Sequence, residues 1–180
     1  EFFDPQPSYL QHIESLVDLS AIRESGIKII VDPMFGAGAG YFEKFLKGGS
    51  TEIIEIRGNR NHSFPGMTQP EPLAHNLKDL MSRVTSQGAH IGIATDGDAD
   101  RLGIVDETGR YLNTLDVFAL LCLHQLDVLG RRGPLVRSIT MTSMVDQLGK
   151  MYGVPVFDTP VGFKYLGPVM MREDALMAGE

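Results

Sequence analysis

The stretch "ATDGDADRLGIVDETG", residues 94–109, joins a strand end, a polar loop and a second strand. The apolar alternation before it ("AHIGI") predicts a strand, "LGIVD" predicts a hairpin arm, and "ETG" predicts the turn of that hairpin. The polar loop therefore lies at the carboxyl end of a strand, where open α/β sheets place their ligand sites. Within it, Asp96, Asp98 and Asp100 stand two residues apart.

This spacing predicts a metal site. Residues i, i+2 and i+4 of an extended loop point the same way, so we expect the carboxylates of Asp96, Asp98 and Asp100 to converge. Their mutual repulsion needs an opposing charge, and hard oxygen ligands suit Mg²⁺ or Ca²⁺. The alternative is a solvated acidic turn without a ligand.

Two other carboxylate motifs compete with this interpretation. In a calcium EF-hand the three aspartates would fill positions 1, 3 and 5, with Glu107 at position 12. Arg101 stands at position 6, where that loop needs glycine, and strands rather than helices flank it. A phosphatase with an aspartate nucleophile would use Asp96 or Asp98, but Ala99 stands where a threonine is usual.

Arg101 directly follows the aspartates. It could neutralise them, or its planar guanidinium could bind a phosphate or sugar beside a metal. The spacing leaves both roles open.

A glycine-rich loop follows the predicted strand at residues 27–32. In "VDPMFGAGAG", the glycines precede a predicted helix and Glu55 follows, as in dinucleotide-binding folds. Tyr41 occupies the position of the last glycine, so the G-x-G-x-x-G fingerprint fails. A tight strand-to-helix turn explains the loop, and a nucleotide-binding module remains an alternative.

The composition excludes several classes of protein. The chain has 180 residues, 43% of them hydrophobic, and a net charge of -7, which argues against a nucleic-acid surface. Its longest apolar run, "VFALLCL", is far shorter than the roughly 20 residues that span a bilayer, so we expect no membrane partner. The single cysteine, Cys122, forms no internal disulfide, which is compatible with a cytoplasmic protein. The histidines show no zinc-binding spacing.

Alternating periodicities predict an α/β fold: two tandem α/β units with mixed, mostly parallel sheets flanked by helices. The predicted boundary lies near Leu112 or Asn113, giving units 1–112 and 113–180. Ser8 is the expected N-cap of the first helix, and Pro168 is expected to interrupt or bound the last. The polar segment 59–72 is a long loop, a type that often carries function. Other predicted elements are strands at 51–58, 89–96, 134–140, 154–160 and from 175, and helices at 41–46, 71–86, 114–130, 142–153 and 162–174.

Five motifs resemble one known family, the α-D-phosphohexomutases, which include phosphoglucomutases and phosphomannomutases. "TDGDADR" at 95–101 resembles the metal-binding loop of that family. "IIVDPMFGAG" and "PEPLAHNLKDL" resemble segments of its second domain, "DTPVGFKYLG" resembles a loop and helix of its third, and the final "GE" resembles the start of its sugar-binding loop. The motifs occur in the family's order and cover nearly the whole chain.

The resemblance implies a role for each motif. Residues 1–112 would be domain 2 of a four-domain enzyme, and 113–180 most of domain 3. Asp96, Asp98 and Asp100 would bind Mg²⁺, while Arg101, Val161, Gly162 and Glu180 would contact a hexose phosphate. A phosphoserine on domain 1 would move a phosphoryl group between C1 and C6 through a bisphosphate intermediate. Some members have threonine where this chain has Val161, so only backbone contact is expected there.

The departures from the family also carry expectations. "NHSFPG" lacks the pattern of the family's phosphoserine loop, so no catalytic residue is assigned in this chain. The chain begins without methionine, and we expect a fragment that lacks domains 1 and 4 and is inactive alone. A phosphoglucosamine mutase of the same family is an alternative parent. A non-enzymatic metal- or nucleotide-binding α/β module is the alternative from another class.

Overall fold

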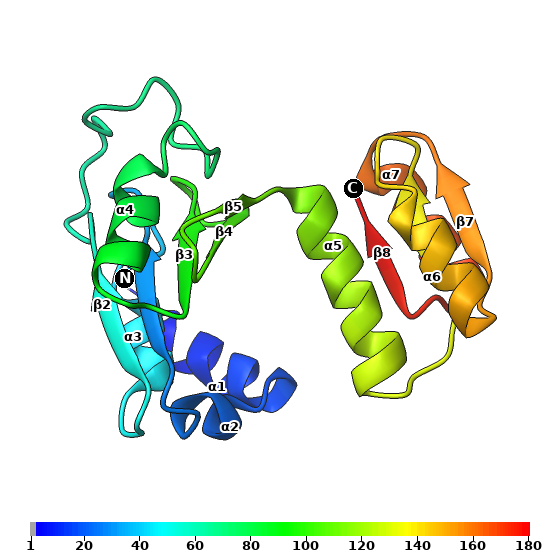
Figure 1. Ribbon diagram of the computed structural model, residues 1–180, viewed down its shortest axis with the longest axis horizontal. Coiled ribbons are helices and arrows are strands. Elements are labelled where there is room, and N and C mark those ends of the chain that lie inside the picture. Colours follow the sequence, from blue (N-terminus) through cyan, green and yellow to red (C-terminus); the bar gives the residue numbers. More distant parts are fainter. Residues whose placement is uncertain (1–2) are drawn as a thin grey trace. The chain divides into compact units, whose positions relative to one another are not determined.

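The computed structural model describes residues 3–180. The chain divides into two compact units, Glu1–Leu112 and Asn113–Glu180 (Figure 1). Each unit is built around its own β-sheet.

The sheet of unit 1 has the strand order β2-β1-β3-β4-β5. β1 pairs in parallel with β2 and β3, whereas β3–β4 and β4–β5 are antiparallel. The aspartate loop therefore connects two antiparallel neighbours, and Thr95 pairs with Leu102 at its base. The strands are β1 (Lys28–Asp32), β2 (Glu52–Glu55), β3 (Ile91–Thr95), β4 (Leu102–Asp106) and β5 (Tyr111–Leu112).

Helices cover both faces of this sheet (Figure 1). Alternate residues of β1 point to opposite faces, so Ile30 packs with Leu80 and Val84 of α4, and Ile29 packs with Leu46 of α3 on the other side. The helices are α1 (Gln6–Leu16), α2 (Leu19–Arg23), α3 (Tyr41–Leu46) and α4 (Lys78–Ser86). The two cores fix the strands whose carboxyl ends carry the polar loops.

Unit 2 contains a three-stranded parallel sheet in the order β7-β6-β8. Phe118 and Cys122 of α5 pack with Val145 of α6 and Leu135 of β6, and α7 contacts all three strands. The elements are α5 (Thr114–Leu123), the π-helical turn η1 (His124–Val128), β6 (Leu135–Ser138), α6 (Met144–Tyr152), β7 (Val156–Thr159), α7 (Phe163–Arg172) and β8 (Met177–Gly179). The α/β class with mixed, mostly parallel sheets is thus confirmed.

Three predicted helices differ from those observed. The helix expected at 71–86 begins only at Lys78, because the segment before α4 forms turns instead, with the Asn76 side chain bonded to the Gln69 and Glu71 carbonyls. The helix expected at 114–130 changes to a π-helical turn at His124. Pro168 lies inside α7 without ending it.

Smaller differences occur at element ends. Ser8 is not an N-cap: α1 starts earlier, with Pro5 as its N-cap, and the Ser8 hydroxyl donates to the Pro5 carbonyl at 3.0 Å. The strand expected at 51–58 ends at Glu55, and Arg57 turns into the left-handed region at φ 51°. Among residues 3–180, no helix combines the length and apolarity required to traverse a bilayer.

Candidate functional site

The three predicted aspartates converge at the carboxyl end of β3. One carboxylate oxygen from each of Asp96, Asp98 and Asp100 lies within 4.8 Å of the other two. Asp96 is buried, whereas Asp98 and Asp100 are exposed. The loop is a tight turn rather than the expected extended segment: the Ala99 N–H donates to the Asp96 carbonyl at 3.2 Å, and Ala99 has φ 65°. We call residues 96–101 the metal loop.

Arg101 lies against these aspartates. Its backbone N–H donates to Asp96 Oδ1 at 3.0 Å and its Nε donates to Asp96 Oδ2 at 2.8 Å. The same Nε lies 3.4 Å from Asp100 Oδ1, and Nη1 donates to Glu71 Oε1 at 2.9 Å. Arg101 therefore offsets part of the negative charge of the loop, as one of the two sequence interpretations expected.

These contacts shift two pKa values. Burial raises the pKa of Asp96, but hydrogen bonds from the backbone and side chain of Arg101 outweigh it and hold that pKa below its ordinary value. The hydrogen bond to Glu71, followed by the contacts with Asp96, raises the pKa of Arg101. Asp96 is therefore a carboxylate at neutral pH, the form that ligates metals.

Two neighbouring loops hold the middle of the metal loop. The Gly97 N–H donates to the Pro70 carbonyl at 3.2 Å, and the Gly97 carbonyl accepts from the Ala37 N–H at 2.9 Å. A Cβ on Gly36 would lie 2.5 Å from the Gly97 carbonyl oxygen, so the two backbones meet without room for a side chain. The glycine-rich loop thus serves close packing.

The glycine-rich loop does not present Glu55 to a nucleotide. Glu55 Oε2 accepts a hydrogen bond from the Gly40 N–H at 2.8 Å, at the start of α3. The residue that a dinucleotide-binding fold would use for ribose is engaged in holding this turn.

An open cavity of about 480 Å³ adjoins the metal loop. Its walls include Phe64, Pro70 and Glu71, from the segment between β2 and α4, together with Asp98 and Arg101. The sequence indicated that this long segment could carry function but placed Glu71 in a helix. The missed feature was the bonding of the Asn76 side chain to the Gln69 and Glu71 carbonyls, which no local pattern indicates.

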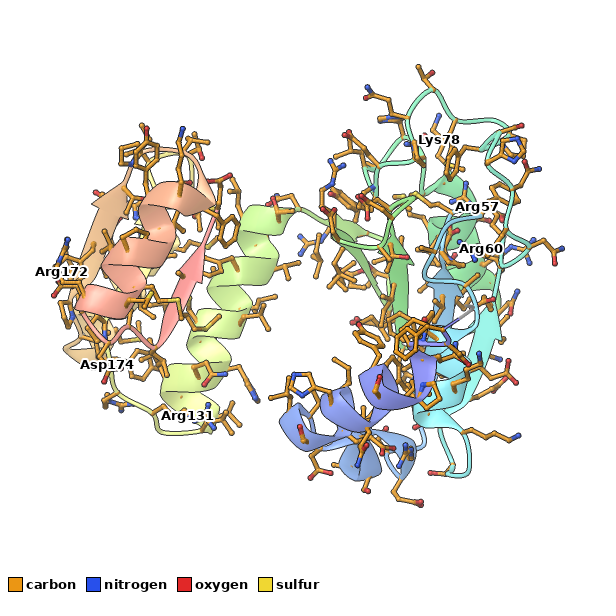
Figure 2. All side chains as sticks on the ribbon, turned by 180° about the vertical axis from the view of Figure 1, so that it is seen from behind. Arg57, Arg60, Lys78, Arg131, Arg172 and Asp174 are labelled. Atoms are coloured by element: carbon orange, nitrogen blue, oxygen red, sulfur yellow. The ribbon has the colours of Figure 1, made fainter. Side chains whose placement is uncertain are left out.

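Asp32 and Arg57 form an ion pair near the loops that contact the metal loop. Asp32 ends β1 with no exposed surface, and Arg57 forms two hydrogen bonds with its carboxylate. Figure 2 shows Arg57 and Arg60 on the segment that leaves β2, and Lys78 at the start of α4. Sequence reasoning missed this pair, because its members stand 25 residues apart.

In unit 2, the predicted sugar-contacting residues meet at one edge of the sheet. The Gly162 N–H donates to Glu180 Oε2, and Val161 is exposed beside it. Asp158 lies within β7 and pairs with Arg137 of β6 at 3.0 Å. In Figure 2, Arg131 and Asp174 mark the opposite edge of this unit.

The donor set of the metal loop fits a hard divalent cation. All three ligands are carboxylates, their oxygens are close enough to share one ion, and two of the three side chains are open to solvent. Arg101 supplies a guanidinium at the same place for an oxyanion.

Comparisons with known proteins match both units. A family model described as "Phosphoglucomutase/phosphomannomutase, alpha/beta/alpha domain II" matches residues 7–109. The model for domain III of the same family matches residues 115–180.

Individual relatives agree with these matches. The chain is 31% identical over 172 residues to a phosphoglucomutase/phosphomannomutase of Thermococcus kodakarensis, covering 96% of this chain and 37% of that protein. A solved structure of a candidate phosphomannomutase of Thermus thermophilus has a TM-score of 0.90 and 32% identity, covering all of this chain and 41% of the other. The chain thus spans about two fifths of the length of these relatives.

A more distant structure shares the fold and holds a metal. The N-acetylphosphoglucosamine mutase of Aspergillus fumigatus, solved with GlcNAc-6P and magnesium, has a TM-score of 0.58 and 21% identity over 82% of this chain and 33% of that one.

Proposed function

This chain belongs to the phosphoglucomutase/phosphomannomutase family, and we propose that it forms the metal-binding and part of the sugar-binding machinery of a Mg²⁺-dependent phosphohexomutase. The full-length protein would move a phosphoryl group between C1 and C6 of a hexose phosphate, through a phosphoserine and a bisphosphate intermediate. Units 1 and 2 would be domains 2 and 3 of that enzyme. The observation that carries the proposal is the cluster of three carboxylates at the end of β3.

Asp96, Asp98 and Asp100 would hold the ion. When bound, Mg²⁺ neutralises charge on a transferring phosphoryl group and orients its oxygens. Buried Asp96 is fixed by two hydrogen bonds from Arg101, whereas the exposed Asp98 and Asp100 can turn toward a ligand. The phosphoserine would come from outside these residues.

Arg101 and the edge of unit 2 would contact the substrate. The guanidinium of Arg101 is more than half exposed and can share its N–H groups with phosphate oxygens. A carboxylate accepts hydrogen bonds from hydroxyls, which suits Glu180 to a sugar. Gly162 and Val161 would offer backbone groups beside it.

The test uses the natural full-length protein with glucose 1-phosphate, mannose 1-phosphate and glucosamine 1-phosphate as separate substrates. We expect conversion of at least one to the 6-phosphate, loss of conversion after chelation, and recovery with Mg²⁺. Conversion of glucosamine 1-phosphate alone would assign the amino-sugar branch instead.

Asp98→Asn tests the metal ligand. Loss of one charged ligand should lower turnover on the order of 100-fold, equivalent to a few kcal/mol of lost electrostatic stabilisation. Asp79→Asn is the matched control, because Asp79 is an exposed acid of α4 that pairs with Arg83 on the same helix. An unchanged rate for Asp98→Asn, with the circular dichroism spectrum preserved, would refute the metal-loop assignment.

A further inference from the structure

A hydrogen-bond network connects the buried end of β1 to the metal loop through residues outside that loop. It starts at the ion pair of Asp32 and Arg57. Arg57 Nε donates to Asp32 Oδ1 at 2.8 Å, and Nη2 donates to Oδ2. Two parallel bonds between guanidinium and carboxylate fix the orientation of both groups.

Arg57 also forms hydrogen bonds with two neighbouring loops, beginning with the segment between β2 and α4. Its Nη2 also donates to the Asn76 carbonyl at 3.0 Å. Its own carbonyl accepts from the Phe35 N–H at 2.9 Å, in the glycine-rich loop. Through its side chain and its main-chain carbonyl, Arg57 thus connects two of the loops that surround the metal loop.

Asn76 is the next link. Its side-chain amide nitrogen donates two hydrogen bonds, one to the main-chain carbonyl of Gln69 and one to that of Glu71, each at 2.9 Å. A side-chain amide has two N–H donors, so this group is fully used. The carbonyls of the two residues that flank Pro70 are therefore held by one side chain.

The segment fixed by Asn76 contacts the metal loop twice. The Pro70 carbonyl accepts from the Gly97 N–H, between the first two aspartates. The Glu71 carboxylate accepts from Arg101, which in turn donates to Asp96.

We propose that Asn76 is a positioning residue for the metal loop, anchored by the Asp32–Arg57 pair and acting through Pro70 and Glu71. The inference rests on the proposed function, which gives the loop a divalent cation. Three like charges favour a spread loop, so a cation site needs neighbours that keep the loop in its turn before the ion arrives. The side chain of Asn76 donates to Gln69 and Glu71 and acts on the aspartates only through them.

The experiment measures metal binding directly. The natural full-length protein is stripped with a chelator and titrated with Mn²⁺, and electron paramagnetic resonance reports free Mn²⁺. Asn76→Asp keeps the shape of the side chain and removes both donors. We expect Mn²⁺ to bind about tenfold more weakly, as for other residues that support metal ligands.

The added negative charge sharpens the test, because simple attraction would tighten Mn²⁺ binding. Asn59→Asp is the matched control: it makes the same change of charge at an exposed position of the same segment. We expect its Mn²⁺ affinity to stay within about twofold of the wild type, since exposed charges are screened.

Each outcome decides the proposal. Unchanged affinity in Asn76→Asp would overturn it, and so would an equal loss in Asn59→Asp. Arg57→Lys keeps the positive charge beside Asp32 but cannot form the two parallel hydrogen bonds of the guanidinium. If Asn76→Asp does not fold, the Mn²⁺ affinity of Arg57→Lys decides the proposal, and an unchanged affinity would overturn it. A merely destabilised protein would show fewer Mn²⁺ sites with unchanged affinity, which also counts against the proposal. Tight Mn²⁺ binding without mutase activity would refute the proposed function alone.

Discussion

The two units secure the polar ends of their strands in contrasting ways. In unit 1, the carboxylate of Asp32 is fully buried and Arg57 is 18% exposed. In unit 2, Arg137 is similarly buried, but its partners Asp146 and Asp158 are 36% and 55% exposed. A buried charge depends entirely on its partner, whereas an exposed one retains water. The buried pair of unit 1 suits a loop that must keep one geometry. The more exposed pairs of unit 2 suit a sheet edge whose side chains can adjust.

Removing the central arginine of each unit should have the largest effect and should separate the two arrangements. Arg57→Met leaves the buried Asp32 carboxylate without a counter-charge, with only the Met34 N–H donating to it, and should destabilise unit 1 by about 3–5 kcal/mol. Arg137→Met leaves two acids that water can reach and should cost unit 2 about 1–2 kcal/mol. Hydrogen exchange in urea, followed on peptides of each unit, measures both losses. Equal losses of stability in the two variants would show that the exposure of the acidic partners does not affect the energy of these ion pairs.

Close backbone packing gives the next effect. Gly36→Ala places a methyl group 2.5 Å from the Gly97 carbonyl oxygen, so backbone must move, at a cost of about 1–3 kcal/mol. In unit 2, the new methyl of Gly149→Ala meets a Val156 methyl and lies 3.0 Å from the Val154 carbonyl oxygen, but the higher helix propensity of alanine offsets about 1 kcal/mol. Thermal unfolding of both variants checks the order. A larger loss for Gly149→Ala would contradict it.

Cys122 offers a chemical measure of unit 2. Burial raises the pKa of its thiol to about 11, so at pH 8 disulfide reagents should label it roughly 100-fold more slowly than an exposed cysteine. Labelling should become faster in Arg137→Met, because opening of this unit exposes the sulfur. Equal labelling rates in the wild type and in Arg137→Met would show that Arg137 does not stabilise this unit.

The smallest effect concerns the hairpin of β4 and β5. Hydrogen bonds from Thr108 hold the pKa of Asp106 below its ordinary value, against a smaller opposing effect of burial. Its ionised form therefore stabilises the turn above about pH 3.9, the unfolded value, and this contribution is lost as pH falls through the lower folded pKa. Carbon NMR titration should give a midpoint below that reference, and Thr108→Val should raise it. A midpoint unaffected by Thr108→Val would show that this hydroxyl does not act on Asp106.

The sequence predicted features that depend on local pattern. The alternation of aspartates led to the metal loop, and the switch between strand and helix periodicity led to the α/β class. Both depend on neighbours within a few residues. The position of the loop could be predicted because the apolar alternation in "AHIGI" predicts a strand just before it.

Features that depend on distant partners could not be predicted. Nothing near Arg57 indicates that it will meet Asp32, and nothing near Asn76 indicates that its amide will bind the carbonyls of Gln69 and Glu71. The helix predicted from residue 71 begins only at Lys78, because the bonds made by the Asn76 side chain favour turns before it. Pro168 shows the opposite case, where packing of α7 on its sheet outweighs the local preference of proline.

The hairpin geometry around the metal loop restricts how this part of the chain can change in length. Both stems of residues 96–101 are hydrogen-bonded strands with a fixed register, so an inserted residue would have to bulge the loop or turn one strand over. Residues 62–68, in the middle of the segment between β2 and α4, belong to no strand register, and doubling a flexible loop costs only about 0.6 kcal/mol. Among related chains, insertions should therefore accumulate in the outer segment and leave the short loop at a constant length.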